Sequence, residues 1–273
     1  MPAINRSLWL TLPLIALLVG VYLIPFLGIV RWSVTLPEPG LGQYRTVFSD
    51  PLVRGVLLRT LRLCLIVTAL SVAAGYALAL VWVRGTPAQR LAAELCILIP
   101  FWISVLTRAF GWLALLSNRG IVNGWLQGAG LTDGPIPMVR NEFGVIVGMT
   151  HFLIPFAVFP IASAMRQVDE RALMAARGMG AGRLRTFAQV FVPMTAPGIV
   201  GAALIVFVFA LGFFVTPAIL GGGRSVMVAE LIWLRIFQSP DWGLAAAIGV
   251  VTIAAVGAIL AVTLRFAKPA VPR

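Results

Sequence analysis

The sequence predicts an all-α integral membrane protein with six transmembrane helices. Of its 273 residues, 60% are apolar and only 11% are charged, and the mean hydropathy is +0.99. This composition is typical of membrane proteins and not of soluble domains. A stretch of about 20 apolar residues is enough to cross a bilayer core as a helix. Six such stretches are present, so we expect a single transmembrane domain over 1–273 with spans at about 8–30, 63–83, 95–116, 143–165, 197–220 and 243–264.

The first apolar stretch, 8–30, follows Arg6 and has to be distinguished from a secretory signal peptide. Its 23 residues are more than a typical signal core of about 7 to 15 residues. The sequence that follows it, Arg31-Trp32-Ser33, lacks the small residues of a cleavage site. We therefore expect an uncleaved first span.

The distribution of basic residues predicts the orientation. With six spans both termini lie on one side of the membrane, and the side richer in Lys and Arg is the cytoplasmic one. Placing the termini, the loop 84–94 and the loop 166–196 inside gives 11 basic residues there and 9 outside. This narrow excess rests mainly on five arginines of the loop 166–196, and it predicts that both termini are cytoplasmic.

The loop 166–196 is polar in a chain that is otherwise mostly apolar. Asp169 and Glu170 place a capping side chain and a first-turn carboxylate ahead of good helix formers, which predicts a short helix ending near Arg177. Glycines at 178, 180 and 182 then favour a cap and a tight reversal. A second short segment, 183–192, is expected to end at Pro193. One interpretation is that this is only an amphipathic connection between two spans.

The same loop resembles the EAA loop of bacterial ABC-importer permeases. The family pattern is Glu-Ala-Ala, three residues, Gly, nine residues, Ile, one residue, Leu-Pro; here 174–176 reads Met-Ala-Ala, and the spacing to Gly180, Val190 and 192–193 fits. Met174 replaces the family Glu, and two valines replace Ile and Leu. The resemblance implies a coupling helix that sits in a groove of a separate ATP-hydrolysing subunit. The residues it assigns to that contact are Leu173, Met174, Ala175, Ala176, Gly180 and Pro193.

One further segment, Gln43-Tyr44-Arg45 with Phe48-Ser49-Asp50-Pro51, resembles the first external loop of the same permeases. Two others resemble the spermidine/putrescine-type branch: the positions Pro100, Arg108, Trp112, Gly120 and Asn123, and the run 212–222 with Phe214-Val215-Thr216-Pro217. The resemblance implies type I ABC importer permease (MetI-like) architecture in the bacterial inner membrane. It implies as partners an ABC ATPase dimer that binds ATP and Mg, a second permease of the same fold, and a periplasmic solute-binding protein. It also favours a polyamine as the solute.

Arg108 lies inside the third predicted span. A guanidinium at that depth costs about 2.5 to 3.5 kcal/mol on insertion scales, so it is expected to face protein or a watery cavity and to be paired. It is a candidate for the translocation path, with a purely structural arginine as the alternative. Pro155 and Pro160 are expected to break the fourth span beside a cavity, and His151 is expected to be a satisfied interhelical donor. The candidate path residues are Arg108, Trp112, Pro155, Phe213, Thr216 and Pro217.

Several other functions lack the residues they require. The run 221–223 is not a Walker A loop, because that loop needs a Lys directly after its last Gly and the one lysine of the chain is Lys268. The catalytic motifs Gly-x-Ser-x-Gly and His-Glu-x-x-His are missing, as is a close carboxylate pair within a span, so we expect no catalysis, cofactor or metal in this chain. Cys64 and Cys96 are expected to be small buried residues of spans, and the scattered basic residues do not indicate nucleic-acid binding.

Three alternatives remain open from the sequence. The importer can serve another small solute, such as an amino-acid derivative or a phosphonate, since Arg108 and the lack of deep acidic residues suit a cation poorly. A secondary carrier would need internal repeats and intramembrane carboxylates. A membrane enzyme would need a polar reactive cluster, and the carboxylates and the one histidine are too dispersed to form it.

Overall fold

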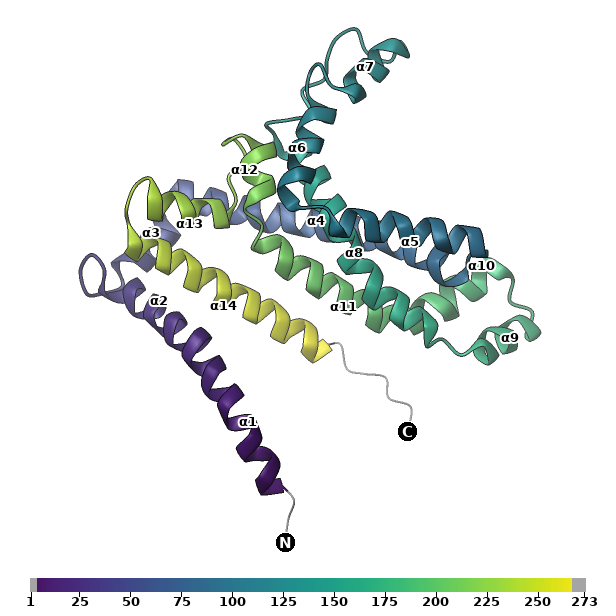
Figure 1. The fold of residues 1–273 in the computed structure, drawn as a ribbon, viewed down its shortest axis with the longest axis horizontal. Coiled ribbons are helices and arrows are strands. Elements are labelled where there is room, and N and C mark those ends of the chain that lie inside the picture. Colours follow the sequence, from purple (N-terminus) through teal and green to yellow (C-terminus); the bar gives the residue numbers. More distant parts are fainter. Residues whose placement is uncertain (1–3, 267–273) are drawn as a thin grey trace. The chain divides into compact units, whose positions relative to one another are not determined.

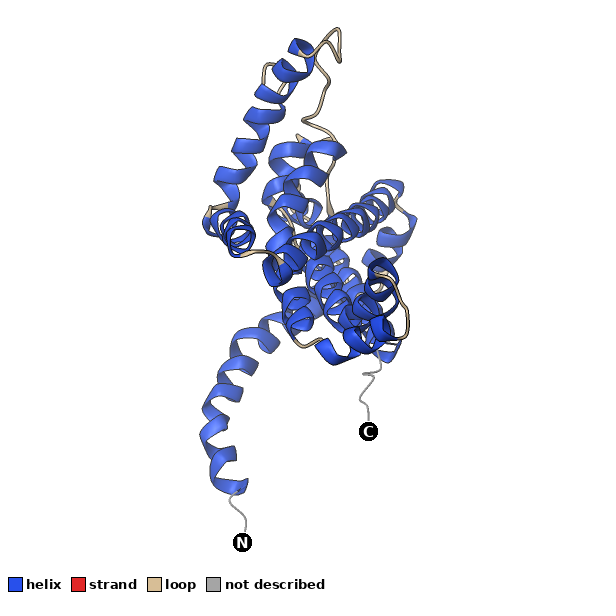
Figure 2. Cartoon of the chain, turned by 90° about the vertical axis from the view of Figure 1, so that its right-hand side faces the viewer, coloured by secondary structure: helices blue, strands red, loops and turns tan. Residues whose placement is uncertain are grey.

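A computed structural model describes the backbone of residues 4–266 and the side chains of 11–263 and 265. Within these residues helices joined by loops make up the structure, and there is no strand (Figure 2). The predicted all-α membrane fold is therefore confirmed. The elements, labelled in Figure 1, are α1 (Ile4–Leu18), a π-helical turn η1 (Val19–Leu23), α2 (Ile24–Thr35), α3 (Gly42–Ser49), α4 (Pro51–Arg84), α5 (Pro87–Trp102), α6 (Val105–Leu116), α7 (Ile121–Gly128), α8 (Glu142–Arg166), α9 (Glu170–Gly178), α10 (Arg183–Thr186), a π-helical turn η2 (Phe187–Phe191), α11 (Val192–Leu211), α12 (Val215–Gly221), α13 (Val228–Phe237) and α14 (Trp242–Phe266).

Five helical stretches of the described chain are long and apolar enough to cross a membrane. A sixth crossing is possible if two helices bent by 107° count as one span. The five are Thr11–Thr35, Pro51–Arg84, Glu142–Arg166, Arg183–Leu211 and Trp242–Thr263, and the bent pair is Pro87–Trp102 with Val105–Gly128. Each predicted span thus has a helical counterpart, although two of them are interrupted.

The predicted span 95–116 is not one helix. Helix α5 ends at Trp102 and α6 begins at Val105, and the two diverge sharply. Pro100 lies in the last turn of α5, and the backbones of Ile103 and Ser104 are extended. A proline lacks a backbone N–H and so weakens the helix around it. Hydropathy registers the whole run as one apolar stretch, but the backbone is broken within it.

The predicted span 197–220 is also divided. Helix α11 ends at Leu211, residues 212–214 lie outside the helices, and α12 begins at Val215. Gly212 forms the C-cap of α11, and Pro217 falls in the first turn of α12, where its missing N–H costs nothing. The outer end of this span is therefore a separate short helix.

Helix α8, in contrast, is continuous through Pro155 and Pro160. The expectation that these prolines break the fourth span is wrong. A proline inside a helix removes one hydrogen bond and can bend the helix without ending it. Pro155 is buried among the neighbours of α8, and this packing supports the helix where the hydrogen bond is lost.

The two cysteines lie in helices but differ in exposure. Cys64 is buried in α4, as predicted, whereas Cys96 in α5 is exposed. The expectation that Cys96 is buried is wrong, because a span in a small membrane protein has one face turned away from its own chain. Among the described residues no cluster of His, Cys, Asp or Glu could hold a metal ion.

The chain divides into two compact units, where the sequence alone predicted a single domain. The first comprises residues 1–55 and 231–258. Within it the rings of Trp32 and Trp242 meet edge to face, with centroids 5.7 Å apart. Asp241 accepts the backbone N–H of Leu244 at 2.9 Å and caps α14. A Cβ at Gly243 would lie 2.1 Å from the backbone oxygen of Leu36, so only glycine permits this close approach.

The second unit comprises residues 56–230 and 259–273 and contains the main hydrophobic core. Helix α8 contributes many of its fully buried residues and lies beside α11 (Figure 1). The two helices are close enough that a Cβ at Gly198 would lie 2.5 Å from Ala164 Cβ and 2.8 Å from the Pro160 backbone oxygen. Helix α4 approaches α8 in the same way, since a Cβ at Gly75 would lie 2.7 Å from Ala157 Cβ. Small residues at such crossings are how membrane helices gain packing contacts.

Glu230, in the first turn of α13, is a buried carboxylate outside the spans. Its Oε2 has no hydrogen-bond partner among the described residues. Burial raises the pKa of Glu230, and a hydrogen bond from the backbone N–H of Met227 opposes this only in part. The folded protein therefore holds the proton at pH values where the unfolded chain has lost it.

Glu230→Gln should raise the apparent Tm of the detergent-solubilised protein at neutral pH. The pKa of the Glu230 side chain is higher in the folded state than in the unfolded state. Its protonation therefore stabilises the fold fully at pH values below the unfolded pKa, near about 4.3, and this stabilisation is lost as the pH rises through the folded pKa. Removing a buried negative charge whose Oε2 has no hydrogen-bond partner should gain about 1 to 3 kcal/mol, or roughly 2 to 4 °C for each kcal/mol. Thermal unfolding measured across pH tests this, with exposed Glu38→Gln as the matched control. Equal Tm profiles for the Glu230 variant and the wild type would contradict it.

Candidate functional site

Helix α9 forms as the sequence predicts. The side chain of Asp169 accepts the backbone N–H of Arg171 at 2.9 Å and caps the N-terminus, and Glu170 forms an ion pair with Arg84 at the end of α4. The helix ends where Gly180 adopts a φ of +88°. The backbone N–H of Ala181 then reaches back to the oxygen of Ala176 at 3.1 Å, a hydrogen bond typical of a glycine-terminated helix.

The second part of the loop differs from the expectation. The segment 183–192 does not end at Pro193; the helical run continues from Arg183 to Leu211 through η2 and into α11. Pro193 lies in the first turn of α11, immediately after the wide π-helical turn. Its missing N–H falls at a place where the regular hydrogen-bond pattern is already interrupted, so the helix tolerates it.

The two faces of the α9 region have different roles. Leu173 and Ala176 are each only 7% exposed and pack on the chain itself, Leu173 as part of the main core. Met174, Met179 and Leu184 are 61%, 84% and 81% exposed. The resemblance assigns Leu173 and Ala176 to a partner contact, and in this structure their side chains pack on residues of the same chain.

The exposed apolar and small residues of this segment include Met174, Ala175, Met179, Gly180 and Leu184, and they lie among exposed arginines. Sequence reasoning missed Met179 and Leu184. The available signal was the presence of large apolar side chains in a loop that is otherwise polar. Exposed apolar side chains gathered on one segment are typical of a protein contact.

Arg108, on α6, is held against an aromatic ring. Its guanidinium carbon lies 4.1 Å from the centroid of Phe152, a cation–π contact. Its Nε and Nη1 atoms are buried and have no hydrogen-bond partner among the described residues. The sequence led us to expect a paired arginine, and the aromatic face takes the place of a carboxylate here.

Trp112, one turn after Arg108, connects α6 to α8. Its indole Nε1 donates a hydrogen bond to Nδ1 of His151 at 3.2 Å. The prediction that His151 is satisfied by an interhelical hydrogen bond is correct, but the imidazole accepts where we expected it to donate. Since Nδ1 accepts, a neutral His151 carries its proton on Nε2.

The remaining candidate path residues fall into two groups. Phe213 contacts Phe152 edge to face at 4.9 Å and so joins the cluster around Arg108. Thr216 and Pro217 are buried in α12, and a Cβ at Gly148 of α8 would lie 2.7 Å from Thr216 Cγ2. Pro155 is buried as well. The structure thus brings Arg108, Trp112 and Phe213 near one stretch of α8. The other three candidates, Pro155, Thr216 and Pro217, are enclosed by tight packing.

Asn123 organises the segment between α6 and α8. It is fully buried, and its side-chain amide donates to the backbone oxygens of Ser117 and Ile136, each at 3.0 Å. Its side-chain oxygen accepts the backbone N–H of Ile136 at 2.8 Å. The Gly120-x-x-Asn123 motif is therefore a structural clamp that joins two distant parts of this segment.

Comparison with known proteins relates this arrangement to a family. No family model matches the chain. The spermidine/putrescine transport system permease protein PotB of Escherichia coli (strain K12) is 32% identical over 223 residues, covering 82% of this chain and 81% of that protein. The chain belongs to the ABC-importer permeases. It is accordingly a multi-pass membrane protein.

Other relatives of the permease agree with this assignment. The putative 2-aminoethylphosphonate transport system permease protein PhnU of Salmonella typhi is 25% identical over 261 residues, 92% of this chain and 89% of that one. Among solved structures, the crystal structure of a bacterial alginate ABC transporter, in complex with an alginate pentasaccharide-bound periplasmic protein, matches with a TM-score of 0.84. That match covers 97% of this permease and 96% of the other chain at 19% identity, which supports the fold alone.

Proposed function

We propose that this permease carries a polyamine such as spermidine or putrescine across the bacterial inner membrane. A periplasmic binding protein delivers the solute, and a separate ABC ATPase hydrolyses ATP. The observation that carries the proposal is the 32% identity to a spermidine/putrescine permease across four-fifths of both chains. Both termini face the cytoplasm in this arrangement, which places α9 where the ATPase lies.

The aromatic cluster beside Arg108 supports a cationic solute. Rings of Phe152, Phe156, Phe209 and Phe213 adjoin one another, with centroid distances of 4.7 to 5.8 Å. Aromatic faces attract ammonium groups without the desolvation cost of a buried carboxylate. Arg108 already occupies the face of Phe152 and its positive charge would repel a cation beside it, so a cationic solute would have to use the other rings of the cluster.

One observation favours a second candidate solute. The buried Nε and Nη1 of Arg108 have no hydrogen-bond partner among the described residues, and a phosphonate or carboxylate oxygen would satisfy them. The relative named for 2-aminoethylphosphonate makes this class a concrete alternative. Such a solute would use Arg108 as a binding residue.

Uptake experiments separate the two solutes. The permease, expressed with its partner subunits in cells lacking their own polyamine importers, should support uptake of radiolabelled spermidine. Unlabelled putrescine should compete for it, and unlabelled 2-aminoethylphosphonate should not. Uptake of labelled 2-aminoethylphosphonate with no spermidine uptake would replace the polyamine assignment by the phosphonate one.

Coupling to the ATPase is proposed to use the exposed face of α9 and the turn after it. Met174, Met179 and Leu184 offer apolar side chains, and Ala175 and Gly180 permit close approach of a partner surface. Leu173 and Ala176 hold this face in place from behind. A second permease of the same fold completes the membrane part, and the ATPase is expected to act as a dimer. Alone, the permease should hydrolyse no nucleotide.

Met174→Asp combined with Met179→Asp should abolish co-purification of the ATPase and uptake of solute. Each charge would be desolvated in an apolar contact, and central interface residues typically contribute about 2 kcal/mol or more, roughly thirtyfold in affinity. Membrane abundance should stay unchanged, because both side chains are exposed. Arg171→Ala, also exposed on α9, is the control. Normal uptake in the double variant would exclude this face from coupling.

A further inference from the structure

The end of α4 marks a membrane boundary. No charged residue occurs from Leu63 to Val83, and Arg84 follows directly. These 21 residues extend about 32 Å as a helix, which matches a hydrocarbon core of about 30 Å. Arg84 therefore lies at the level of the lipid headgroups. Trp82 lies two residues before Arg84 in the same helix. The guanidinium carbon of Arg166 lies over its ring, 4.8 Å from the ring centroid, and tryptophan side chains are typical of the membrane interface.

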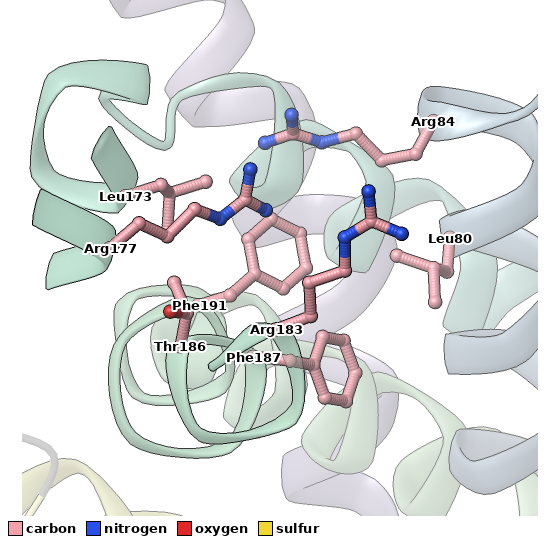
Figure 3. A pocket seen from close by; sticks show the side chains of 8 residues that line it. All are labelled: Leu80, Arg84, Leu173, Arg177, Arg183, Thr186, Phe187 and Phe191. Carbon is pink, nitrogen blue, oxygen red and sulfur yellow. The ribbon is translucent and has the colours of Figure 1, made fainter. Parts of the chain in front are cut away.

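A pocket opens at this level between α4, α9 and the α10–η2 region. Its cavity volume is about 230 Å³. The guanidinium groups of Arg84, Arg177 and Arg183 converge on it from three different elements, as Figure 3 shows. Apolar side chains and one hydroxyl group complete its lining: Leu80, Leu173, Thr186, Phe187 and Phe191.

The charges around this pocket are not balanced by the described part of the chain. Glu170 pairs with Arg84, and no carboxylate lines the pocket itself. Arg84 also lies over the ring of Phe191, with its guanidinium carbon 5.0 Å from the centroid. Three guanidinium groups and one carboxylate leave a net charge of +2 at the pocket. Arg177 and Arg183 are exposed, so water screens part of this repulsion, and an anion bound between the arginines would relieve the rest.

The size and position of the pocket indicate which anion fits. Pockets for whole small molecules usually measure about 300 to 1,000 Å³, so this one suits a single ionic group and not a nucleotide. Arginine forks match the oxygens of a phosphate, often with two hydrogen bonds each. The buried Leu173 lines the pocket, and Met174 and Met179 do not. The pocket is therefore separate from the exposed surface that these two methionines form and that is proposed for the ATPase.

We propose that this pocket binds the phosphate group of an anionic phospholipid. The arginines hold the phosphate, and the apolar side chains on the α4 side receive the adjoining part of the lipid. Basic pockets between membrane helices on the cytoplasmic side are suited to such headgroups. The bound lipid connects the end of α4 to α9 and α10 and so steadies the loop 166–196 against its own spans. This inference rests on the membrane setting of the chain and on the proposed cytoplasmic side of the loop 166–196, and on neither the solute nor the ATPase assignment.

The test uses the full-length permease in nanodiscs and compares phosphatidylglycerol with phosphatidylcholine. Native mass spectrometry should show phosphatidylglycerol retained by the wild type, and thermal unfolding should show a higher apparent Tm in phosphatidylglycerol. Arg177→Gln with Arg183→Gln should weaken phosphatidylglycerol binding by about fivefold per arginine, or roughly 25-fold together. The double control Arg171→Gln with Arg185→Gln removes the same charge from exposed positions of the same loop that do not line the pocket. It should keep near-wild-type binding.

Each other outcome has a distinct meaning. Equal loss in the control pair would show that loop charge in general attracts the lipid, and would overturn the pocket. Unchanged binding in the Arg177 and Arg183 variant would do the same. If inorganic phosphate alone gives the full rise in Tm, the ligand is a free anion and the lipid assignment is wrong. If the variant retains the lipid but loses the ATPase, the arginines bind a carboxylate of that partner.

Discussion

Gly198→Val should remove most of the folded permease from the membrane. A Cβ at this position would lie 2.5 Å from Ala164 Cβ and 2.8 Å from the backbone oxygen of Pro160. Neither atom is the end of a flexible side chain, so α11 would have to move away from α8. Overpacking typically costs about 1 to 3 kcal/mol and more where the backbone must shift. Because α8 contributes much of the core, the whole of the second unit should suffer.

Gly201→Val is the matched control for that change. Gly201 lies on the same helix, and a Cβ there would meet nothing within 4 Å. This variant should accumulate and carry solute at near wild-type levels. The comparison is made by immunoblotting of membranes and by size-exclusion chromatography in detergent. Equal abundance of the two variants would mean that α8 and α11 are not packed as closely as described.

Asn123→Leu should destabilise the segment between α6 and α8 by about 3 kcal/mol or more. The substitution leaves the backbone oxygens of Ser117 and Ile136 and the N–H of Ile136 without their partner, and each unsatisfied buried group costs about 1 to 3 kcal/mol. Leucine has a similar size, so the loss is one of hydrogen bonds and not of volume. Transport should fall with it, because this segment leads directly into α8.

Limited proteolysis of residues 117–141 in the detergent-solubilised protein measures that effect. Cleavage should become about a hundredfold faster or more in Asn123→Leu, as a loss of about 3 kcal/mol or more in local stability implies. Gln127→Leu, exposed on the same helix, is the control and should be cleaved at the wild-type rate. Resistance of the Asn123 variant to the protease would show that its three hydrogen bonds do not hold the segment together.

The sequence predicted best the features that depend on neighbouring residues. The cap at Asp169, the short helix after it and the left-handed glycine at 180 all follow from local backbone chemistry, and all are present. The composition likewise predicted the membrane class. The orientation of the chain, by contrast, rested on a small excess of arginines and stays a prediction.

Features that depend on tertiary packing were not available from the sequence. Leu173 and Met174 are both apolar neighbours on α9, and only the packing of the helix on its own core decides which one is buried. The direction of the hydrogen bond between Trp112 and His151 depends on how α6 crosses α8. Hydropathy treats 95–116 as one stretch because it measures composition and contains no information on backbone direction.

The interruption between α5 and α6 has a consequence for hydration. The first backbone N–H groups of α6, at Val105, Leu106 and Thr107, have no acceptor within their own helix, and Ser104 provides no side-chain cap. Lipid chains offer no hydrogen bonds to such groups. Water or polar atoms of the protein must therefore reach these N–H groups. At this break the apolar path of the chain is interrupted by polar atoms, and an uninterrupted hydrocarbon barrier is not possible there.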